Sequence, residues 1–242
     1  MQLIPIESIN ELTFREIFNK SFDLSIDYSE ITLDSLFDDA VVREIPIVKT
    51  VVAAVKIGIA YREKYFLKKL LVFLSEINKG DINTENIIAF REKMQRDKKY
   101  RDKVITMISV LLDKFVDDKK AKILGRLFKA YAEGTINWVK FIELSSCLDL
   151  VFVSDFIVLK YLYDRRDGDM IHIETFSDAT IDSSSFESAV TRLNAIGAVL
   201  VEAMADVGDS IHLGRHTKIT QLGIVFYELG FSKDISDLIN FA

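Results

Sequence analysis

Apolar residues recur at helical spacing along most of this chain, and few residues interrupt the pattern. Two prolines and ten glycines in 242 residues leave long segments without a breaker, which is typical of a mainly helical protein. Beyond the first forty residues, which carry two short helical patterns, helices are expected from 45 to 74, from 84 into the stretch 91–103, and over 104–115, 119–133 and 136–148. Thr84 and the pair Asp117–Asp118 are candidate caps for two of these helices, and Gly134 is the candidate residue just after helix 119–133. The pattern predicts an all-helical domain with a basic centre over residues 1–147.

The segment from Ile45 to Leu74 is apolar on almost every side. Pro46 suits the first turn of a helix, and the turn residues 78–81 are expected to end it. Such a helix is either the buried centre of a bundle or an element that docks on a membrane surface. We expect burial; in the membrane alternative, which could equally be a partner surface, the candidate side chains are Lys49, Lys56, Lys68 and Lys69.

Residues 148–242 mix helices with short strands, so a second and smaller α+β domain is predicted there. Helices are expected over 151–163 and 184–196. The second is expected to open with Ser184 and Glu187 at the spacing of a capping box and to end at Gly197. A short strand is expected at 170–174, followed later by a hairpin with strands 198–204 and 210–219. Thr220 is expected to cap a last helix.

The residues around the predicted hairpin carry a resemblance. Leu193, Ile196 and Gly197 precede the hairpin, and Thr220 and Gly223 follow it. This arrangement resembles the tail of many bacterial winged-helix proteins and covers roughly residues 152–231. More loosely, a helical body before such a tail resembles bacterial abortive-infection proteins of the Abi-alpha kind. The resemblance implies an N-terminal helical bundle followed by a winged-helix-like domain, and a role in phage defence or phage counter-defence.

The chain carries a net charge of −6, with basic residues concentrated in the centre and acidic residues towards both ends. A basic stretch of this kind is a candidate surface for an anionic partner. Only Tyr100 is available there for stacking on bases, so such a surface would follow phosphates rather than read a sequence. The candidate nucleic-acid surface consists of Arg91, Lys93, Arg96, Lys98, Lys99, Arg101 and Lys103.

A winged-helix domain that reads DNA places its second helix in the major groove and needs basic or amide side chains there. The candidate winged-helix surface is Thr191, Arg192, Arg215 and Lys218. Glu187 lies on the same helix, and Asp206 and Asp209 lie at the hairpin turn, so phosphates would meet carboxylates. We therefore expect the acidic C-terminal domain to contact protein, or a second copy of itself, rather than DNA.

The sequence has no recognisable catalytic, cofactor or metal motif. The glycine-rich signatures of dinucleotide and phosphate-binding loops are absent. Cys147 is the single cysteine, which excludes a disulfide scaffold, and we expect it to be buried as a small apolar residue. His212 and His216 are predicted on one strand, about 13 Å apart, which is too far for one zinc ion. No cofactor, metal or small-molecule substrate is therefore expected.

Together these features predict a non-enzymatic, helical interaction protein whose partner is another protein or a second copy of the chain. The single cysteine and the absence of signal-peptide features at residues 1–7 favour the cytoplasm. One alternative is a peripheral membrane protein that docks on anionic lipid through helix 45–74. A further alternative is a nucleic-acid binder that follows phosphates with the basic stretch 91–103.

Overall fold

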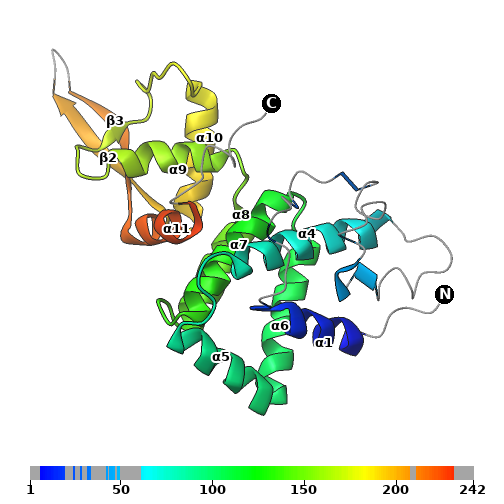
Figure 1. Cartoon of the computed structure of the whole chain (residues 1–242). Helices are drawn as coiled ribbons and strands as arrows, with labels where there is room; N and C mark the ends of the chain where they lie inside the picture. The colour runs from blue at the N-terminus through cyan, green and yellow to red at the C-terminus, as the bar shows by residue number, and fades with distance from the viewer. Residues whose placement is uncertain are drawn as a thin grey trace. The chain divides into compact units, whose positions relative to one another are not determined.

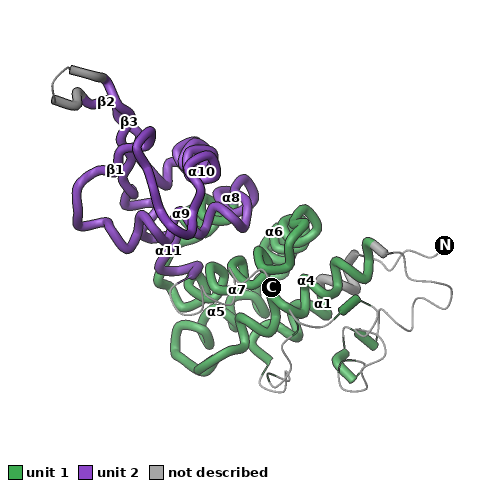
Figure 2. Tube along the Cα trace, turned by 90° about the horizontal axis from the view of Figure 1, so that it is seen from above, with its two compact units in different colours: residues 1–145 green, residues 146–242 purple. Residues whose placement is uncertain are grey.

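The computed structural model describes residues 6–19, 24, 28, 32–33, 42, 44–46, 48–49, 61–207 and 211–231. The described chain is mainly helical and contains a small three-stranded antiparallel sheet. It divides into two compact units, residues 1–145 and 146–242 (Figure 2). The division lies within helix α8 (Trp138–Leu150), close to the boundary between residues 147 and 148 that the sequence predicted.

Unit 1 is built from helices in the order that the apolar pattern predicted (Figure 1). Two of its helices begin at caps that were expected: Thr84 accepts a hydrogen bond from the amide of Ile87, and Asp117 accepts one from the amide of Lys119. Gly134, at a φ of +76°, follows the end of the second of these helices, as expected. The helices are α1 (Ile6–Glu16), α4 (Tyr61–Asn78), α5 (Glu85–Arg96), α6 (Lys98–Lys114), α7 (Asp118–Ala132) and the first part of α8.

The core of unit 1 is an aromatic cluster around Phe128 on α7. The Phe128 ring is fully buried, and five other rings have centroids within 6.3 Å of its own. Because aromatic side chains bury large apolar areas, this cluster is a main source of stability for the unit. The five rings belong to Phe18, Phe73, Phe90, Tyr131 and Phe141.

Helices α4 and α7 approach closely because α7 carries a glycine where they meet. A Cβ atom on Gly125 would lie 2.9 Å from the Cβ atom of Glu76 and 3.0 Å from the carbonyl oxygen of Phe73. Beside this contact, Arg126 Nε lies 2.8 Å from Glu76 Oε1, and both side chains are largely buried. The close approach places the second half of the predicted helix 45–74 inside the bundle; residues 50–60 lie outside the described residues.

Unit 2 combines three helices, besides the end of α8, with the sheet. These are α9 (Asp155–Asp164), α10 (Ser183–Ala195) and α11 (Gln221–Phe231). The strands are β1 (Ile171–His172), β2 (Val199–Val207) and β3 (Ile211–Ile219), in the spatial order β1-β3-β2. Strands β2 and β3 pair along their whole length, whereas β1 pairs with β3 only at Thr217 and His216. The β2–β3 hairpin therefore extends well beyond β1 and away from the helices of its unit (Figure 1).

Two helix starts in unit 2 differ from the prediction. Helix α10 is capped by Asp182 rather than by Ser184: its Oδ1 atom accepts hydrogen bonds from the Ser185 amide at 2.9 Å and the Ser184 hydroxyl at 2.7 Å. These bonds hold the pKa of Asp182 down at about 2. Helix α9 begins at Asp155 rather than Val151.

The residues that carried the resemblance join α10, β2 and α11. Gly197 has a φ of +74°, and its carbonyl oxygen accepts a hydrogen bond from the Thr220 hydroxyl at 2.7 Å. The same hydroxyl accepts a hydrogen bond from the amide of Gly223 at 3.1 Å, so Thr220 caps α11 as predicted. A Cβ atom on Gly223 would lie only 2.1 Å from the carbonyl oxygen of Ala198, so this position requires glycine.

Candidate functional site

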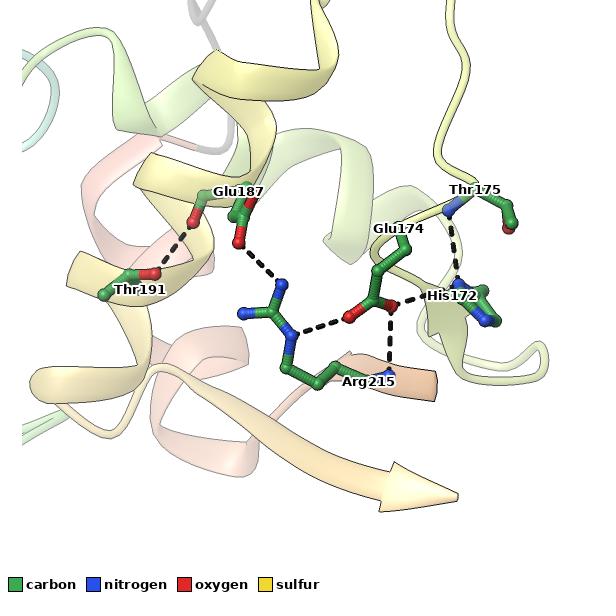
Figure 3. A network of polar contacts seen from close by, with 6 residues as sticks. All are labelled: His172, Glu174, Thr175, Glu187, Thr191 and Arg215. Atoms are coloured by element: carbon green, nitrogen blue, oxygen red, sulfur yellow. Dashed lines mark hydrogen bonds and ion pairs between the residues drawn. The ribbon is translucent and has the colours of Figure 1, made fainter. Parts of the chain in front are cut away.

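Arg215, on β3, is held by two carboxylates of its own unit (Figure 3). Its Nε lies 2.7 Å from Glu174 Oε1, and its Nη2 lies 2.6 Å from Glu187 Oε1 on α10. The backbone amide of Arg215 also donates to Glu174 Oε2 at 3.0 Å. These contacts raise the pKa of Arg215, with Glu187 contributing most, and the guanidinium holds the pKa of Glu174 down at about 2.

Arg192, on α10, is likewise engaged by a carboxylate. Asp155 is fully buried at the start of α9, and the Arg192 guanidinium binds it with two nitrogens, Nε at 2.9 Å from Oδ2 and Nη2 at 2.6 Å from Oδ1. The Phe152 amide also donates to Asp155 Oδ2 at 2.9 Å, and the guanidinium lies 4.8 Å from the centre of the Phe152 ring. The Asp155 carboxylate raises the pKa of Arg192. This pair joins α9 to α10.

The other two residues of the candidate winged-helix surface also make contacts within unit 2. The Thr191 hydroxyl donates to the carbonyl oxygen of Glu187 at 2.9 Å, inside α10. Lys218 Nζ donates to the carbonyl oxygen of Gly168 at 3.2 Å. The two arginines that were expected to face a partner are thus balanced by carboxylates, and Lys218 retains an uncompensated positive charge among the described residues.

The hairpin exposes apolar side chains. Leu213 on β3 is 81% exposed, and Leu200 and Met204 on β2 are 44% and 43% exposed. The register places Leu200 and Met204 on one face of the hairpin and Leu213 on the other. Ala203 and Glu202, between Leu200 and Met204 on β2, are exposed as well. Sequence reasoning missed these exposed side chains. The available signal was strand length: the predicted hairpin strands are longer than the predicted strand 170–174, so part of the hairpin has no third strand beside it.

His172 and His216 are neighbours across β1 and β3, with ring centroids 4.7 Å apart. His172 Nδ1 accepts a hydrogen bond from the Thr175 amide at 3.3 Å, and the same atom lies 3.3 Å from Glu174 Oε2, to which it donates when protonated (Figure 3). Sequence reasoning placed His172 on a separate strand and missed this cross-strand pair. No group of three or more histidine, cysteine or acidic side chains with the geometry of a metal site occurs among the described residues.

The predicted nucleic-acid surface is divided between two helices. Asp97 ends α5 and caps α6, and its carboxylate accepts a hydrogen bond from the Tyr100 amide at 2.9 Å. Tyr100 is half-buried, its ring packs edge-on against Phe90, and its hydroxyl bonds to that of Tyr131, so it is not free to stack on a base.

The basic side chains of this stretch differ in how they are engaged. Arg96 pairs with Glu92 at 2.9 Å, and Arg101 pairs with Glu11 at 3.2 Å. Two lysines lie over aromatic rings, Lys93 over Tyr100 and Lys103 over Trp138. Arg91, Lys98 and Lys99 have no ion-pair partner among the described residues, and both lysines are exposed.

The lysines of the candidate membrane surface do not form one surface. Lys69 is buried, and its Nζ donates to the carbonyl oxygens of Phe115 at 2.6 Å and Asp113 at 3.3 Å, near the end of α6. Burial lowers the pKa of Lys69. The expectation of a surface is therefore wrong for Lys69, because its side chain satisfies backbone carbonyls inside unit 1.

The remaining members of that set are engaged or outside the described residues. Lys68 is largely buried and pairs with Asp118 at 2.7 Å. Lys49 is exposed and pairs with Glu44 at 2.6 Å, and Lys56 lies outside the described residues. None of the described helices combines the length and apolar character needed to cross a bilayer.

A pocket of about 290 Å³ opens between α9 and α10 and is lined mainly by small polar side chains. Its charged groups already have internal roles, since Asp155 and Arg192 bind each other and Asp182 caps α10. Cys147 lies elsewhere in unit 2, buried as expected, with its Sγ 3.8 Å from the carbonyl oxygen of Ile196.

The comparisons with known proteins add no relative: no protein-family model, curated protein or solved structure matches this chain.

The Glu174–Arg215 contact predicts a pH dependence of the stability of unit 2. In the folded protein the pKa of Glu174 is lowered from its ordinary value of 4.5 to about 2. Its contribution to the free energy of unfolding is therefore present above pH 4.5 and is lost as the pH falls towards 2. We expect the difference in melting temperature between the wild type and Glu174→Gln to shrink over this range. Thermal melts of both proteins at several pH values measure it, and a difference that stays constant with pH would contradict the assignment.

Proposed function

We propose that this chain is a non-enzymatic interaction protein whose C-terminal unit is a winged-helix-like module for protein contact. The order α9, β1, α10, hairpin and α11 supports the winged-helix likeness, as does the Gly197–Thr220–Gly223 junction that joins α10, β2 and α11. One observation carries the proposal. The arginines of the candidate surface, Arg192 and Arg215, are bound by carboxylates, whereas Leu213 and Met204 on the hairpin are exposed.

The physical consequence differs for nucleic acid and for protein. Affinity for DNA comes largely from free cationic side chains that displace counterions from phosphates, and Arg215 would have to leave two carboxylates to do so. Those carboxylates would then face the phosphates. Exposed apolar side chains, by contrast, contribute favourable free energy when a protein partner covers them.

The cellular setting is proposed from the resemblance alone. The likeness to winged-helix tails and to abortive-infection proteins supports a place in phage defence, or in a phage's countermeasure, within the bacterial cytoplasm. In that setting, the C-terminal unit would carry the contact with the partner.

A second candidate function is phosphate contact by unit 1, and one observation favours it. Lys98 and Lys99, at the start of α6, are exposed and have no ion-pair partner among the described residues. They lie beside Asp97 and Asp102, so we expect any such binding to be weak and sensitive to salt.

Duplex binding of the full chain tests the proposal. We expect weak binding for the wild type at low salt and little at physiological salt. The double variant Glu174→Gln, Glu187→Gln should bind several-fold more tightly, with a steeper dependence on salt, because it frees Arg215 and removes two negative charges. The double variant Glu202→Gln, Asp167→Asn is the control for the loss of two charges alone, since Glu202 lies on β2 opposite His216 and the Asp167 side chain is 92% exposed.

Two results of the same assay would change the conclusion. Tight wild-type binding at physiological salt that Arg215→Ala abolishes would overturn the protein-contact proposal. Binding that is lost in Lys98→Glu, Lys99→Glu but unchanged in Arg215→Ala would favour the second candidate, contact with phosphates through unit 1.

A further inference from the structure

Strand β2 is a long, mostly apolar edge strand whose charged residues are Glu202 and Asp206. In the order β1-β3-β2, β3 is the only described strand that pairs with it. Residues 199–207 include no proline and no lysine, and β2 is nine residues long. Long apolar edge strands are templates for pairing with another chain, and a two-stranded ribbon is only marginally stable by itself.

The direction of the backbone groups of β2 follows from the contacts of its neighbour. The carbonyl oxygen of Arg215 accepts a hydrogen bond from the Ile173 amide at 2.8 Å, and the Arg215 amide donates to Glu174, so both groups point away from β2. Ala203 lies opposite Arg215 in the register. In an antiparallel ladder this makes Ala203 a member of a non-hydrogen-bonded pair, whose amide and carbonyl point to the open edge.

The start of the hairpin agrees with this assignment. The Thr220 amide donates to the carbonyl oxygen of Ala198 at 3.0 Å, so Ala198 belongs to the alternate set that faces β3. Val199, Val201 and Ala203 are therefore in the set whose amides and carbonyls face outward. Along the open edge, every second residue offers both a donor and an acceptor to an added strand.

We propose that β2 pairs antiparallel with β2 of a second copy of this chain, with Ala203 on the twofold axis, to form a continuous six-stranded sheet. This inference rests on the proposed protein-contact function and names its partner. Antiparallel pairing of a strand with itself is the symmetry of a closed dimer, in which the same surface is used on both copies. Each Ala203 amide then donates to the Ala203 carbonyl of the other copy.

Repulsion between like charges favours this register over the two registers that are centred one residue away. Centring the pair on Ala203 places Glu202 of one copy opposite Met204 of the other. Centring it on Glu202 places two glutamates directly opposite each other, and centring it on Met204 places Glu202 opposite Asp206. Like charges at opposed positions of a strand pair are destabilising, so only the first register avoids them and also pairs the whole of β2.

Sedimentation velocity of the full chain over a wide range of concentration tests the pairing and its register. The wild type should form a dimer as its concentration rises. Met204→Glu should raise the dimer dissociation constant by about tenfold or more, since it opposes Glu202 at two symmetric positions. Met204→Lys, the matched control, should leave it unchanged or lower it, since it places unlike charges there. Residue 204 lies opposite Gly214, so neither side chain crowds β3.

A disulfide provides a second measurement of the twofold axis. In a Cys147→Ser background, Ala203→Cys should form a disulfide-linked dimer on mild oxidation. The two Cα atoms of a hydrogen-bonded antiparallel pair are about 5.5 Å apart, within the range that a disulfide spans. Thr191→Cys, at an exposed site on α10, is the control and should remain largely monomeric.

A monomer at every concentration would overturn the inference, as would equal dissociation constants for Met204→Glu and Met204→Lys or cross-linking of Ala203→Cys no faster than the control. A monomer whose hairpin cross-links to a different protein would refute self-pairing but leave the proposed protein-contact function standing. A monomer whose hairpin cross-links to no protein would refute both.

Discussion

Replacing Phe128 with alanine is expected to lower the free energy of unfolding of unit 1 by about 3–5 kcal/mol. The ring is fully buried and contacts other aromatic rings from α4, α5, α7 and α8. Truncation removes the transfer free energy of the ring and leaves a cavity that these large neighbours can only partly fill. Denaturant unfolding followed by far-ultraviolet circular dichroism measures the loss.

Val139→Ala is the control for this variant. Val139 lies on α8 and is 74% exposed, so its truncation should change the free energy of unfolding by less than about 0.5 kcal/mol. A loss below about 1 kcal/mol for Phe128→Ala would mean that the aromatic cluster is not the core of unit 1.

The second large effect is expected for Arg192→Ala, which should destabilise unit 2 by about 3 kcal/mol. Asp155 is fully buried. Of the contacts described above for its carboxylate, only the hydrogen bond from the Phe152 amide remains when the guanidinium is removed. An uncompensated buried charge accounts for most of the loss. The arginine is partly exposed, which places the expected value at the lower end for buried pairs.

A double variant separates the charge from the packing of Arg192. Adding Asp155→Asn to Arg192→Ala removes the buried charge and should restore much of the lost stability, because an amide needs no counter-charge. Arg192→Lys keeps the charge but not the two-nitrogen geometry, so its loss should be intermediate. If adding Asp155→Asn lowers the stability of the Arg192→Ala variant further, loss of the ion pair is not the reason that Arg192→Ala destabilises unit 2.

The parts of the fold that the sequence predicted are those set by local chemistry. Thr84, Asp117 and Thr220 cap helices, and Gly134 and Gly197 end them, because each effect involves residues within a few positions along the chain. The mainly helical class follows from the apolar spacing and the scarcity of breakers. The cap of α10 was misplaced by two residues because Asp182 and Ser184 are both good caps, and spacing alone does not choose between them.

The candidate site depended on contacts between distant positions, which one sequence does not reveal. Arg192 reaches Asp155 and Arg215 reaches Glu174 across some forty residues of chain, so both arginines appeared available to a partner. Lys69 was grouped with the candidate surface lysines of helix 45–74, yet the end of α6 buries it. The exposed apolar hairpin emerged only from the register, which leaves most of β3 without β1 beside it.

Site-specific photo-cross-linking from position 213 tests the protein-contact claim most directly. A photoreactive residue replaces Leu213, the most exposed apolar side chain among those described in the hairpin, in the full chain in its own cells. A matched probe at Asp167, whose side chain is 92% exposed in the turn after α9, is the control. The proposal predicts protein adducts from position 213 well above those from position 167, and no nucleic-acid adducts. Nucleic-acid adducts at 213, or protein adducts no more frequent than at 167, would contradict it.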